Sequence, residues 1–278
     1  MDITQEQLDY LKKTHVHIAL PCYGGQLFEC VLTGLLKFAI ACTKLGINFS
    51  VDTMINESLI SRGRNSLCAK FMDNSAATHI MWIDSDIGFE PEHIFALLLH
   101  NKDVVGGLYP KKTLPIDYVV NINPEAVGEN GQIKVENGLI PVSRIGTGFM
   151  MVARHVFEKM AVTYPQLKFK NNIGLDPKFD KWMYTFYDTG ISPDTNEYLS
   201  EDWLFCDRWR AIGGEIWADP SVKLDHSGYF RYPGSPEKLN QIINGPNADN
   251  SNMPASLLPK MAVRQDVTKN GAIENIIK

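Results

Sequence analysis

The sequence predicts an α/β protein with a Rossmann-like, mostly parallel central sheet flanked by helices. Over roughly the first hundred residues, apolar β-rich segments alternate with segments of helical periodicity. This alternation predicts parallel strands joined by right-handed crossovers. Polar residues and glycines follow several of the strands directly, at the edge where open α/β sheets bind ligands.

The first strand and the first long helix form one unit. His15 to Pro21 is apolar and β-rich, and residues 22–25 break the strand with two glycines. Residues 26–45 then place Leu, Phe and Ile at helical spacing, and Gly46 ends that helix. Together these segments predict one βα unit.

A second unit leads to the most informative stretch of the chain. Residues 47–54 alternate like a strand, and residues 58–72 return to a helical pattern. Residues 80–83 are typical of a buried strand, and it ends abruptly in Asp84 and Asp86. The strand therefore delivers two carboxylates to its exposed C-terminal end.

The later elements are shorter and less regular. A helix is expected from Pro91 to about His100 and a strand from Asp103 to Tyr109, after which residues 113–143 are rich in Pro, Gly and Asn with short strand-like pieces. We further expect a strand at 145–152, a helix at 154–160 and an irregular segment at 164–196. A helix at 200–212 and two short strands at 215–218 and 222–224 should follow.

The chain shows no internal repeat and no marked domain boundary. We expect a single domain over residues 1–230 and a C-terminal extension over residues 231–278 that packs on this domain or trails from it. The extension is rich in Pro, Asn and Ser, a composition typical of a segment without a core of its own.

Composition excludes several classes of protein. The 278 residues are 44% hydrophobic, enough for a packed core, and the net charge of −5 with scattered Lys and Arg excludes a polynucleotide partner. The polar N-terminus is unlike a secretory signal, and no apolar run approaches the roughly 20 residues of a membrane-spanning helix. The 5 cysteines lack CxxC spacing, so we expect reduced thiols in a soluble, cytoplasmic protein.

The paired aspartates favour a metal site. Carboxylates at a strand end suit Mg²⁺ or Mn²⁺, particularly where the ion also holds a diphosphate. The alternative is a chance match, since aspartates are common in loops and at helix N-caps, and Glu90 and Pro91 begin a helix nearby. Asp86 lies too early in the chain to cap that helix well. The context therefore indicates sugar-nucleotide chemistry.

The order of short motifs resembles a known family. A first strand ending in Pro21-Cys22-Tyr23 is followed by Gly63-Arg64-Asn65 on a helix, then Asp84-Ser85-Asp86, then Glu201-Asp202. This order resembles the GT-A fold of nucleotide-sugar-dependent glycosyltransferases, in particular family 2 and the fungal mannan-polymerase relatives. The resemblance covers Ile18 to about His226, and its strength is in order and spacing because each motif is short.

The resemblance implies a fold, a reaction and a cofactor. The fold is of GT-A type with a smaller mixed β region on the acceptor side. The reaction is hexosyl transfer from a UDP- or GDP-linked sugar to a hydroxyl of a glycan, a lipid-linked molecule or a protein, with inversion or retention left open. The cofactor is Mn²⁺ or Mg²⁺, and Asp84, Asp86 and His226 are the implied ligands. A lone histidine is more often structural, although imidazole suits Mn²⁺.

The nucleotide sugar is expected at the N-terminal half of the sheet edge. Arg62 and Arg64 flank a glycine at a helix start, where guanidinium and backbone N–H groups can face a diphosphate, although they can equally be exposed cations. Tyr23 can stack on the base or serve as a packing lid. The residues assigned to nucleotide-sugar binding are Pro21, Tyr23, Arg62, Arg64, Asn65, Asp84 and Ser85.

The catalytic assignment is to Glu201 and Asp202. In inverting relatives a carboxylate at this place removes the acceptor's proton, and the resemblance gives that role to Asp202. The alternative is an acidic first turn that complements the helix dipole, and both can hold together. The residues assigned to the sugar or acceptor are Gly146, Thr147, Gly148 and Trp203, with Trp182 and Tyr184 as further stacking surfaces.

Two other functional classes remain open. A nucleotidylyltransferase shares the sheet topology, but it normally carries a basic, glycine-rich loop after strand one, and residues 22–26 contain no Lys or Arg. A haloacid-dehalogenase-type phosphatase uses paired aspartates on its first strand, whereas here they follow two βα units. A non-catalytic nucleotide-sugar-binding protein needs neither Asp202 nor the metal ligands Asp86 and His226.

Overall fold

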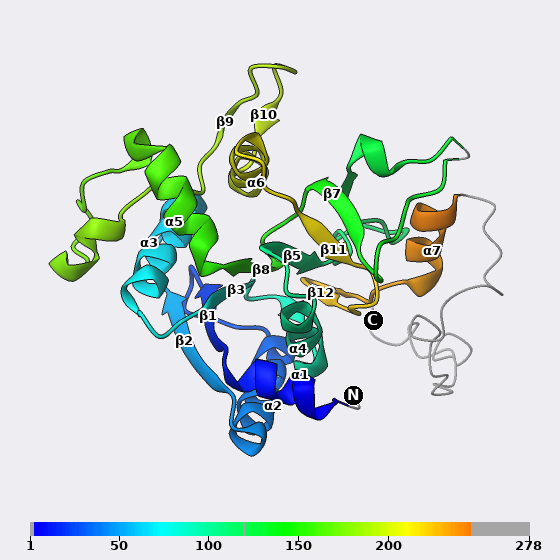
Figure 1. Cartoon of the computed structure of the whole chain (residues 1–278), viewed down its shortest axis with the longest axis horizontal. Coiled ribbons are helices and arrows are strands. Elements are labelled where there is room, and N and C mark those ends of the chain that lie inside the picture. The colour runs from blue at the N-terminus through cyan, green and yellow to red at the C-terminus, as the bar shows by residue number, and fades with distance from the viewer. Residues whose placement is uncertain (1–2, 119, 130, 246–278) are drawn as a thin grey trace, which may run out of the picture.

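The computed structural model describes residues 3–118, 120–129 and 131–245 (Figure 1). Its main sheet has 8 strands in the order β2-β1-β3-β8-β5-β11-β7-β6. These strands are β1 (His15–Pro21), β2 (Asn48–Met54), β3 (His79–Ile83), β5 (Val104–Gly107), β6 (Asn121–Ile122), β7 (Ile140–Arg144), β8 (Phe149–Ala153) and β11 (Trp217–Asp219).

The sheet is mixed but mostly parallel. β1 pairs in parallel with both β2 and β3, and β11 pairs in parallel with β5. β8 is antiparallel to β3 and β5, and β7 is antiparallel to β11 and β6, so only β7 and β8 run against the others in this sheet. The carboxyl ends of β1, β2 and β3 therefore lie along one edge. The predicted fold class is confirmed.

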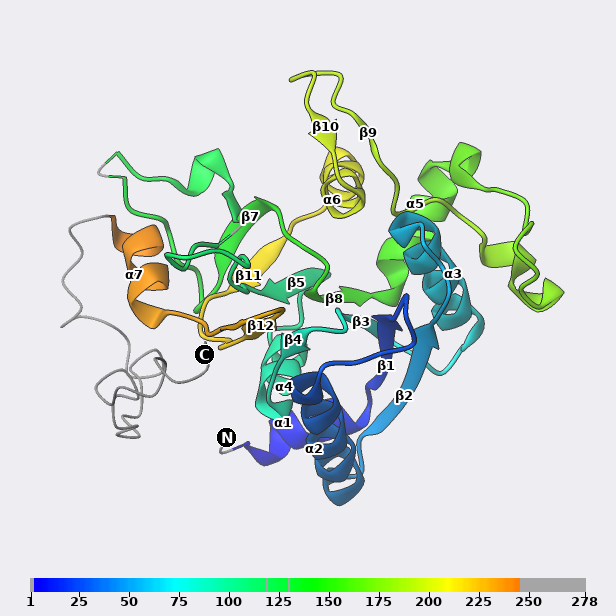
Figure 2. The same ribbon diagram turned by 180° about the vertical axis from the view of Figure 1, so that it is seen from behind.

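Helices cover both faces of the sheet (Figure 2). One core layer joins the sheet to α1, α2 and α4, and a second joins it to α3, α5 and α6. Both layers are dominated by large side chains without exposed surface, such as Phe38 on one side and Phe157 on the other. The helices are α1 (Gln5–Lys12), α2 (Glu29–Leu45), α3 (Ile60–Asp73), α4 (Pro91–Leu99), α5 (Arg154–Thr163), α6 (Glu201–Ala211) and α7 (Pro236–Asn244).

A second, antiparallel sheet lies against the carboxyl edge of β3. It has the order β13-β12-β4, from β4 (Ile87–Gly88), β12 (Asp225–Ser227) and β13 (Arg231–Tyr232). In this sheet His226 pairs with Ile87, the residue after Asp86. A short hairpin of β9 (Gly190–Ile191) and β10 (Tyr198–Leu199) precedes α6.

Several predicted boundaries need correction. The strand expected at 145–152 begins only at Phe149, because residues 145–148 form the turn that enters the site. The strand expected at 222–224 is absent from the described chain, and the strand is instead β12, which contains His226. The prediction misplaced this strand because β12 has three residues and its partner β4 has two, and such short strands show no alternation of apolar and polar residues in the sequence.

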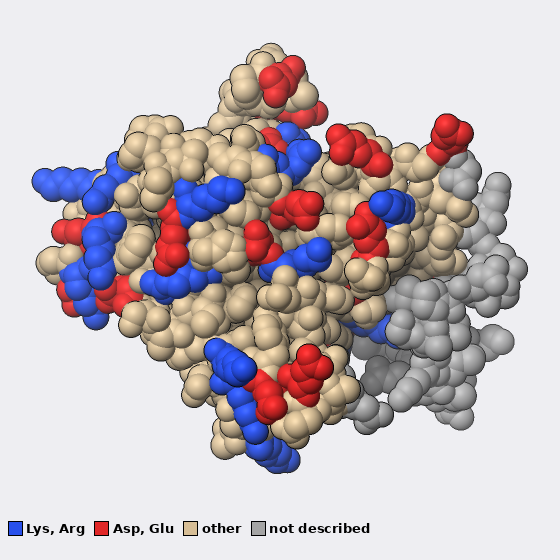
Figure 3. Space-filling model, viewed as in Figure 1, with Lys and Arg blue, Asp and Glu red and all other residues tan. Residues whose placement is uncertain are grey.

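The C-terminal extension is described only in part. α7 buries Leu239 and Ile243 in the core layer that contains α3, α5 and α6. Residues 246–278 lie outside the described residues, and the predicted division at 230/231 stays a prediction. Across the described helices, none is long and apolar enough to cross a membrane. Positive and negative side chains are interspersed over the face shown in Figure 3.

Candidate functional site

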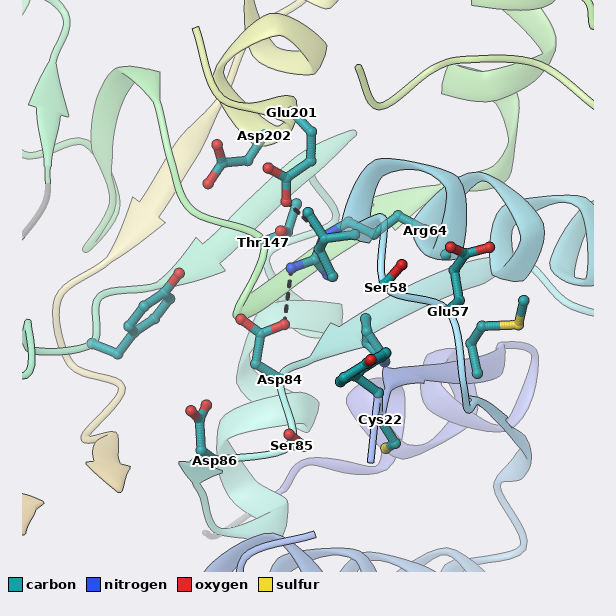
Figure 4. A pocket seen from close by; sticks show the side chains of 16 residues that line it. Cys22, Glu57, Ser58, Arg64, Asp84, Ser85, Asp86, Thr147, Glu201 and Asp202 are labelled. Carbon is teal, nitrogen blue, oxygen red and sulfur yellow. Dashed lines mark hydrogen bonds and ion pairs between the residues drawn. The ribbon is translucent and has the colours of Figure 1, made fainter. Parts of the chain in front are cut away.

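A cavity of about 420 Å³ opens at the carboxyl ends of β1, β2 and β3 (Figure 4). α3 contributes to one side of it and the start of α6 to another. The predicted site residues that line the cavity are Pro21, Tyr23, Arg64, Asp84, Ser85, Asp86, Thr147, Glu201 and Asp202. Residues up to 181 positions apart in the chain, 21 and 202, therefore meet in one place.

Backbone hydrogen bonds hold the aspartate turn. Asp84 N–H donates to the carbonyl of Gly148 at 2.9 Å, and Phe28 N–H donates to the carbonyl of Ser85 at 2.9 Å. Ser227 N–H donates to the carbonyl of Asp86 at 2.8 Å. Three different segments thus fix the turn between β3 and β4, so its carboxylates are pre-positioned.

Arg64 joins the aspartate turn to the start of α6. Its Nη2 donates to Asp84 Oδ1 at 2.9 Å and its Nε donates to Glu201 Oε1 at 3.0 Å. The side chain is only 4% exposed and lies over the Trp82 ring at 5.5 Å. Burial acts to lower the pKa of Arg64, but the two carboxylates outweigh it and raise the pKa. The guanidinium is therefore a permanent cation between two acids.

This arrangement corrects the expectation that Arg64 faces a diphosphate freely. Two of its nitrogen atoms are already bound to carboxylates, and Nη1 alone has no hydrogen-bond partner among the residues that the structure describes. Arg64 positions Asp84 and Glu201, and its Nη1 is buried without a described partner.

Asp86 and His226 meet as the motif order suggested. His226 Nε2 lies 3.5 Å from Asp86 Oδ1, and His226 Nδ1 lies 2.8 Å from the carbonyl of Pro110. Because a carbonyl only accepts, Nδ1 carries a proton, and Nε2 is the ring nitrogen that faces the carboxylate of Asp86. A backbone carbonyl behind the distal nitrogen is also the usual support of a metal-ligating histidine.

The pair fits a divalent cation with few protein ligands. The expected set of three ligands, Asp84, Asp86 and His226, is not brought together: no group of three His, Cys, Asp or Glu side chains converges on one point within the described ranges, and Asp84 is paired with Arg64. Two ligands are enough where substrate phosphates and water complete the shell, as is usual for Mg²⁺. Burial acts to raise the pKa of Asp86, but His226 and Lys112 outweigh it and hold the pKa low. Asp86 is therefore ionised and able to bind a cation.

Asp202 has one engaged and one available oxygen. Its Oδ1 accepts from the Ser200 hydroxyl and, at 2.8 Å, from the Trp203 N–H. Its Oδ2 has no hydrogen bond to the described residues and lies beside Gly146 in the cavity wall. Burial raises the pKa of Asp202, which makes it a stronger base once ionised. The structure thus holds this carboxylate in one orientation, with Oδ2 left without a described hydrogen-bond partner.

The glycines of the GTG turn contact Tyr109. A Cβ atom at Gly146 would lie 2.2 Å from the Tyr109 hydroxyl oxygen, and one at Gly148 would lie 2.7 Å from its Cζ. The two glycines therefore make room for the Tyr109 ring, which occupies the space expected for a sugar or acceptor. Gly148 N–H donates to the Tyr109 hydroxyl at 3.2 Å, while Thr147 lines the cavity.

Other predicted residues lie outside the cavity. Asn65 is buried and exchanges two hydrogen bonds with the backbone of Tyr187, of 2.7 and 2.9 Å, so its role here is structural. Arg62 forms an ion pair with Glu57, which lines the cavity although Arg62 does not. Trp203 lies under the Arg144 guanidinium at 5.1 Å, away from the cavity lining. Trp182 and Tyr184 pack against the core.

Several residues of the site were not predicted: Glu57, Ser58 and Tyr109 line the cavity, and Lys112 contacts Asp86 beside it. Tyr109 ends a predicted strand, and burial raises the pKa of its hydroxyl, which stays protonated. Lys112 places its Nζ 2.5 Å from Asp86 Oδ2. The signal available in the sequence for Tyr109 and Lys112 was position alone: both follow β5, which runs parallel to β3 with the antiparallel β8 between them, so its carboxyl end lies at the same edge as the aspartates.

Comparison with known proteins gives only distant similarities. No family model and no curated protein matches the chain. The crystal structure of A197 from STIV is 17% identical, with a TM-score of 0.45 over 77% of this chain and 86% of that one. GalNAc-T7 with UDP, GalNAc and Mn²⁺ is 9% identical, with a TM-score of 0.45 over 77% of this chain and 43% of its own. A 4-diphosphocytidyl-2C-methyl-D-erythritol synthase from Anaerococcus prevotii is 10% identical, with a TM-score of 0.32 over 72% and 99%. Function is therefore inferred from the side chains of the site.

Proposed function

We propose that this chain is a metal-dependent glycosyltransferase of GT-A type, which moves a hexose from a UDP- or GDP-linked sugar to a hydroxyl of a glycan, lipid-linked or protein acceptor. The proposal rests on two features beside one cavity, a carboxylate–imidazole pair that could hold a cation and a separate buried carboxylate that could act as a base. Asp86 and His226 form the pair, and Asp202 is the base. A non-catalytic nucleotide-sugar-binding or scaffold protein needs neither of them.

The residues of this chain have separable tasks in the reaction. Tyr23, 65% exposed at the cavity rim, offers a ring on which the nucleotide base can stack. Asp86 and His226 would hold Mn²⁺ or Mg²⁺, which supplies charge neutralisation for the leaving diphosphate. Arg64 Nη1 provides one further donor in the cavity wall. These groups bind and orient the donor sugar.

The transfer step requires a base. The acceptor oxygen attacks the anomeric carbon while the bond from that carbon to the diphosphate oxygen breaks, and the acceptor's proton passes to Asp202 Oδ2 in the inverting case. Ser200 and Trp203 keep the other oxygen of Asp202 occupied, so the free oxygen keeps its direction. Glu201, held by Arg64, adds negative charge near the forming oxocarbenium.

A donor panel tests the proposal. We expect one of the UDP- or GDP-linked hexoses to be hydrolysed slowly, or transferred when an acceptor is present, only with Mn²⁺ or Mg²⁺, and to raise the melting temperature of the protein. Release of the nucleoside diphosphate is the readout, and Asp86→Ala is the inactive control. Pyrophosphate release from a nucleoside triphosphate and a sugar 1-phosphate would instead identify a nucleotidylyltransferase, and no turnover or stabilisation by any donor would refute both enzymes.

A further inference from the structure

Lys112 pairs with the carboxylate of the candidate metal pair. Its Nζ lies 2.5 Å from Asp86 Oδ2, while His226 Nε2 lies 3.5 Å from the other oxygen of the same carboxylate. The turn after β5 contributes twice to this arrangement. It contains Lys112, and the carbonyl of Pro110, two residues earlier, accepts the hydrogen bond of His226. An ammonium group and a metal ion therefore compete for one carboxylate.

We propose that Lys112 neutralises Asp86 only while the site is empty, and that it moves to the diphosphate of the donor when a divalent cation binds Asp86. This inference rests on the proposed function. In it, Lys112 is both the resting counter-ion of the metal site and a contact of the leaving diphosphate. A tightly bound donor thus needs the metal and the lysine together.

The surroundings of Lys112 allow this movement. Its side chain is 40% exposed, whereas that of Asp86 is 19% exposed, so the lysine is the mobile partner. A Cβ atom at Gly228 would lie 3.3 Å from Lys112 Cδ, so the absence of a side chain there leaves room for the stem. Ammonium is a compact charge on four methylenes that can reach another anion without a change in the backbone.

The charges at this place predict when Lys112 leaves Asp86. Without ligand, one ammonium and one carboxylate balance at this place. A divalent cation beside Lys112 and Asp86 leaves excess positive charge, which repels the ammonium from the carboxylate. A nucleoside diphosphate brings the missing negative charge, and the released ammonium can hydrogen-bond its oxygens. Lys112 therefore opposes binding of the metal alone and favours binding of the metal with the diphosphate.

Lys111 is a matched control. It neighbours Lys112 in sequence and is equally exposed at 40%, but its Nζ pairs with Asp117 at 2.8 Å rather than with the cavity. A change at Lys111 removes the same charge from the same turn. Of these two lysines, Lys112 is the one that pairs with Asp86.

The test measures two affinities with opposite expected changes. Mn²⁺ alone is titrated against the full chain by electron paramagnetic resonance of the free ion, and UDP and GDP are then titrated at saturating Mn²⁺ by calorimetry. Lys112→Met is expected to bind Mn²⁺ about fivefold more tightly than the wild type, because one ion pair no longer competes. It is expected to bind UDP or GDP about tenfold more weakly, with recovery in Lys112→Arg.

The outcomes separate this proposal from the proposed function. Lys111→Met should match the wild type in both titrations. If the wild type binds Mn²⁺ and nucleotide but Lys112→Met changes neither affinity, or weakens both, the exchange is wrong while the enzyme assignment stands. If neither protein binds Mn²⁺ or a nucleoside diphosphate under any condition, both are refuted.

Discussion

Replacing Asp202 by Asn is expected to slow sugar transfer by about 10²- to 10⁴-fold, with donor and Mn²⁺ affinities unchanged. The amide oxygen can still accept from Ser200 and the Trp203 N–H, so the local geometry is kept while the base is lost. Turnover is measured at saturating donor and acceptor, and affinity is measured separately by calorimetry. Asp207→Asn, in which the same change is made on the same helix but at a residue paired with Arg144, should retain activity.

The pH dependence of the same variant checks the cause. Burial raises the pKa of Asp202, so the wild type should lose kcat/KM on the acid side at a pH above the ordinary range of aspartate. Because the pKa is higher in the folded state than in the unfolded chain, ionisation of Asp202 costs stability as the pH rises through the folded value. Asp202→Asn should therefore be more stable than the wild type at neutral pH, and this difference should vanish in acid. A less stable variant with full activity would contradict the role.

Replacing Arg64 by Met is expected to lower the free energy of unfolding by about 3 kcal/mol, because it leaves Asp84 and Glu201 without their shared cation. Denaturant unfolding at neutral pH provides the measurement. Adding Glu201→Gln to the Arg64→Met variant should recover part of the loss, since one of the two unpaired charges is then removed.

The matched control for this change is Arg62→Met. Arg62 lies on the other side of the same glycine, its side chain is 40% exposed, and it pairs with Glu57 rather than with Asp84 or Glu201, so its loss should destabilise the fold less than the loss of Arg64. Equal destabilisation by the two substitutions would show that Arg64 does not organise the site. Loss of donor binding in Arg64→Met with unchanged stability would instead place Arg64 on the ligand alone.

Part of this site was predictable from local patterns. The first strands and helices are predictable from hydrophobic periodicity and from the glycines that end them. The ends of β1 and β3 then lie together because neighbouring parallel strands end at the same edge of the sheet. The meeting of Asp86 with residue 226 was anticipated only through the resemblance in motif order. The structure then supplies the physical reason, which is the pairing of β12 with β4.

The remaining contacts depend on tertiary packing that no local pattern contains. The sequence does not indicate which acidic residues pair with Arg64, because its partners lie 20 and 137 positions away in the chain. Asn65 follows Arg64 directly yet faces the interior, where the backbone of Tyr187 in an irregular segment needs two hydrogen bonds. Lys112 belongs to a turn without periodicity, so its reach to Asp86 could not be read from spacing.

The central claim is that Asp86 and His226 bind one divalent cation together with a nucleoside diphosphate. Electron spin echo envelope modulation of Mn²⁺ bound to the protein with UDP or GDP tests it directly, because nitrogen and phosphorus nuclei at the metal modulate the echo. The account predicts ¹⁴N modulation from one imidazole in the wild type, its loss in His226→Gln, and its retention in His155→Gln, whose histidine pairs with Asp103 elsewhere. A wild-type complex with phosphorus coupling but no nitrogen modulation would contradict the proposed ligand pair.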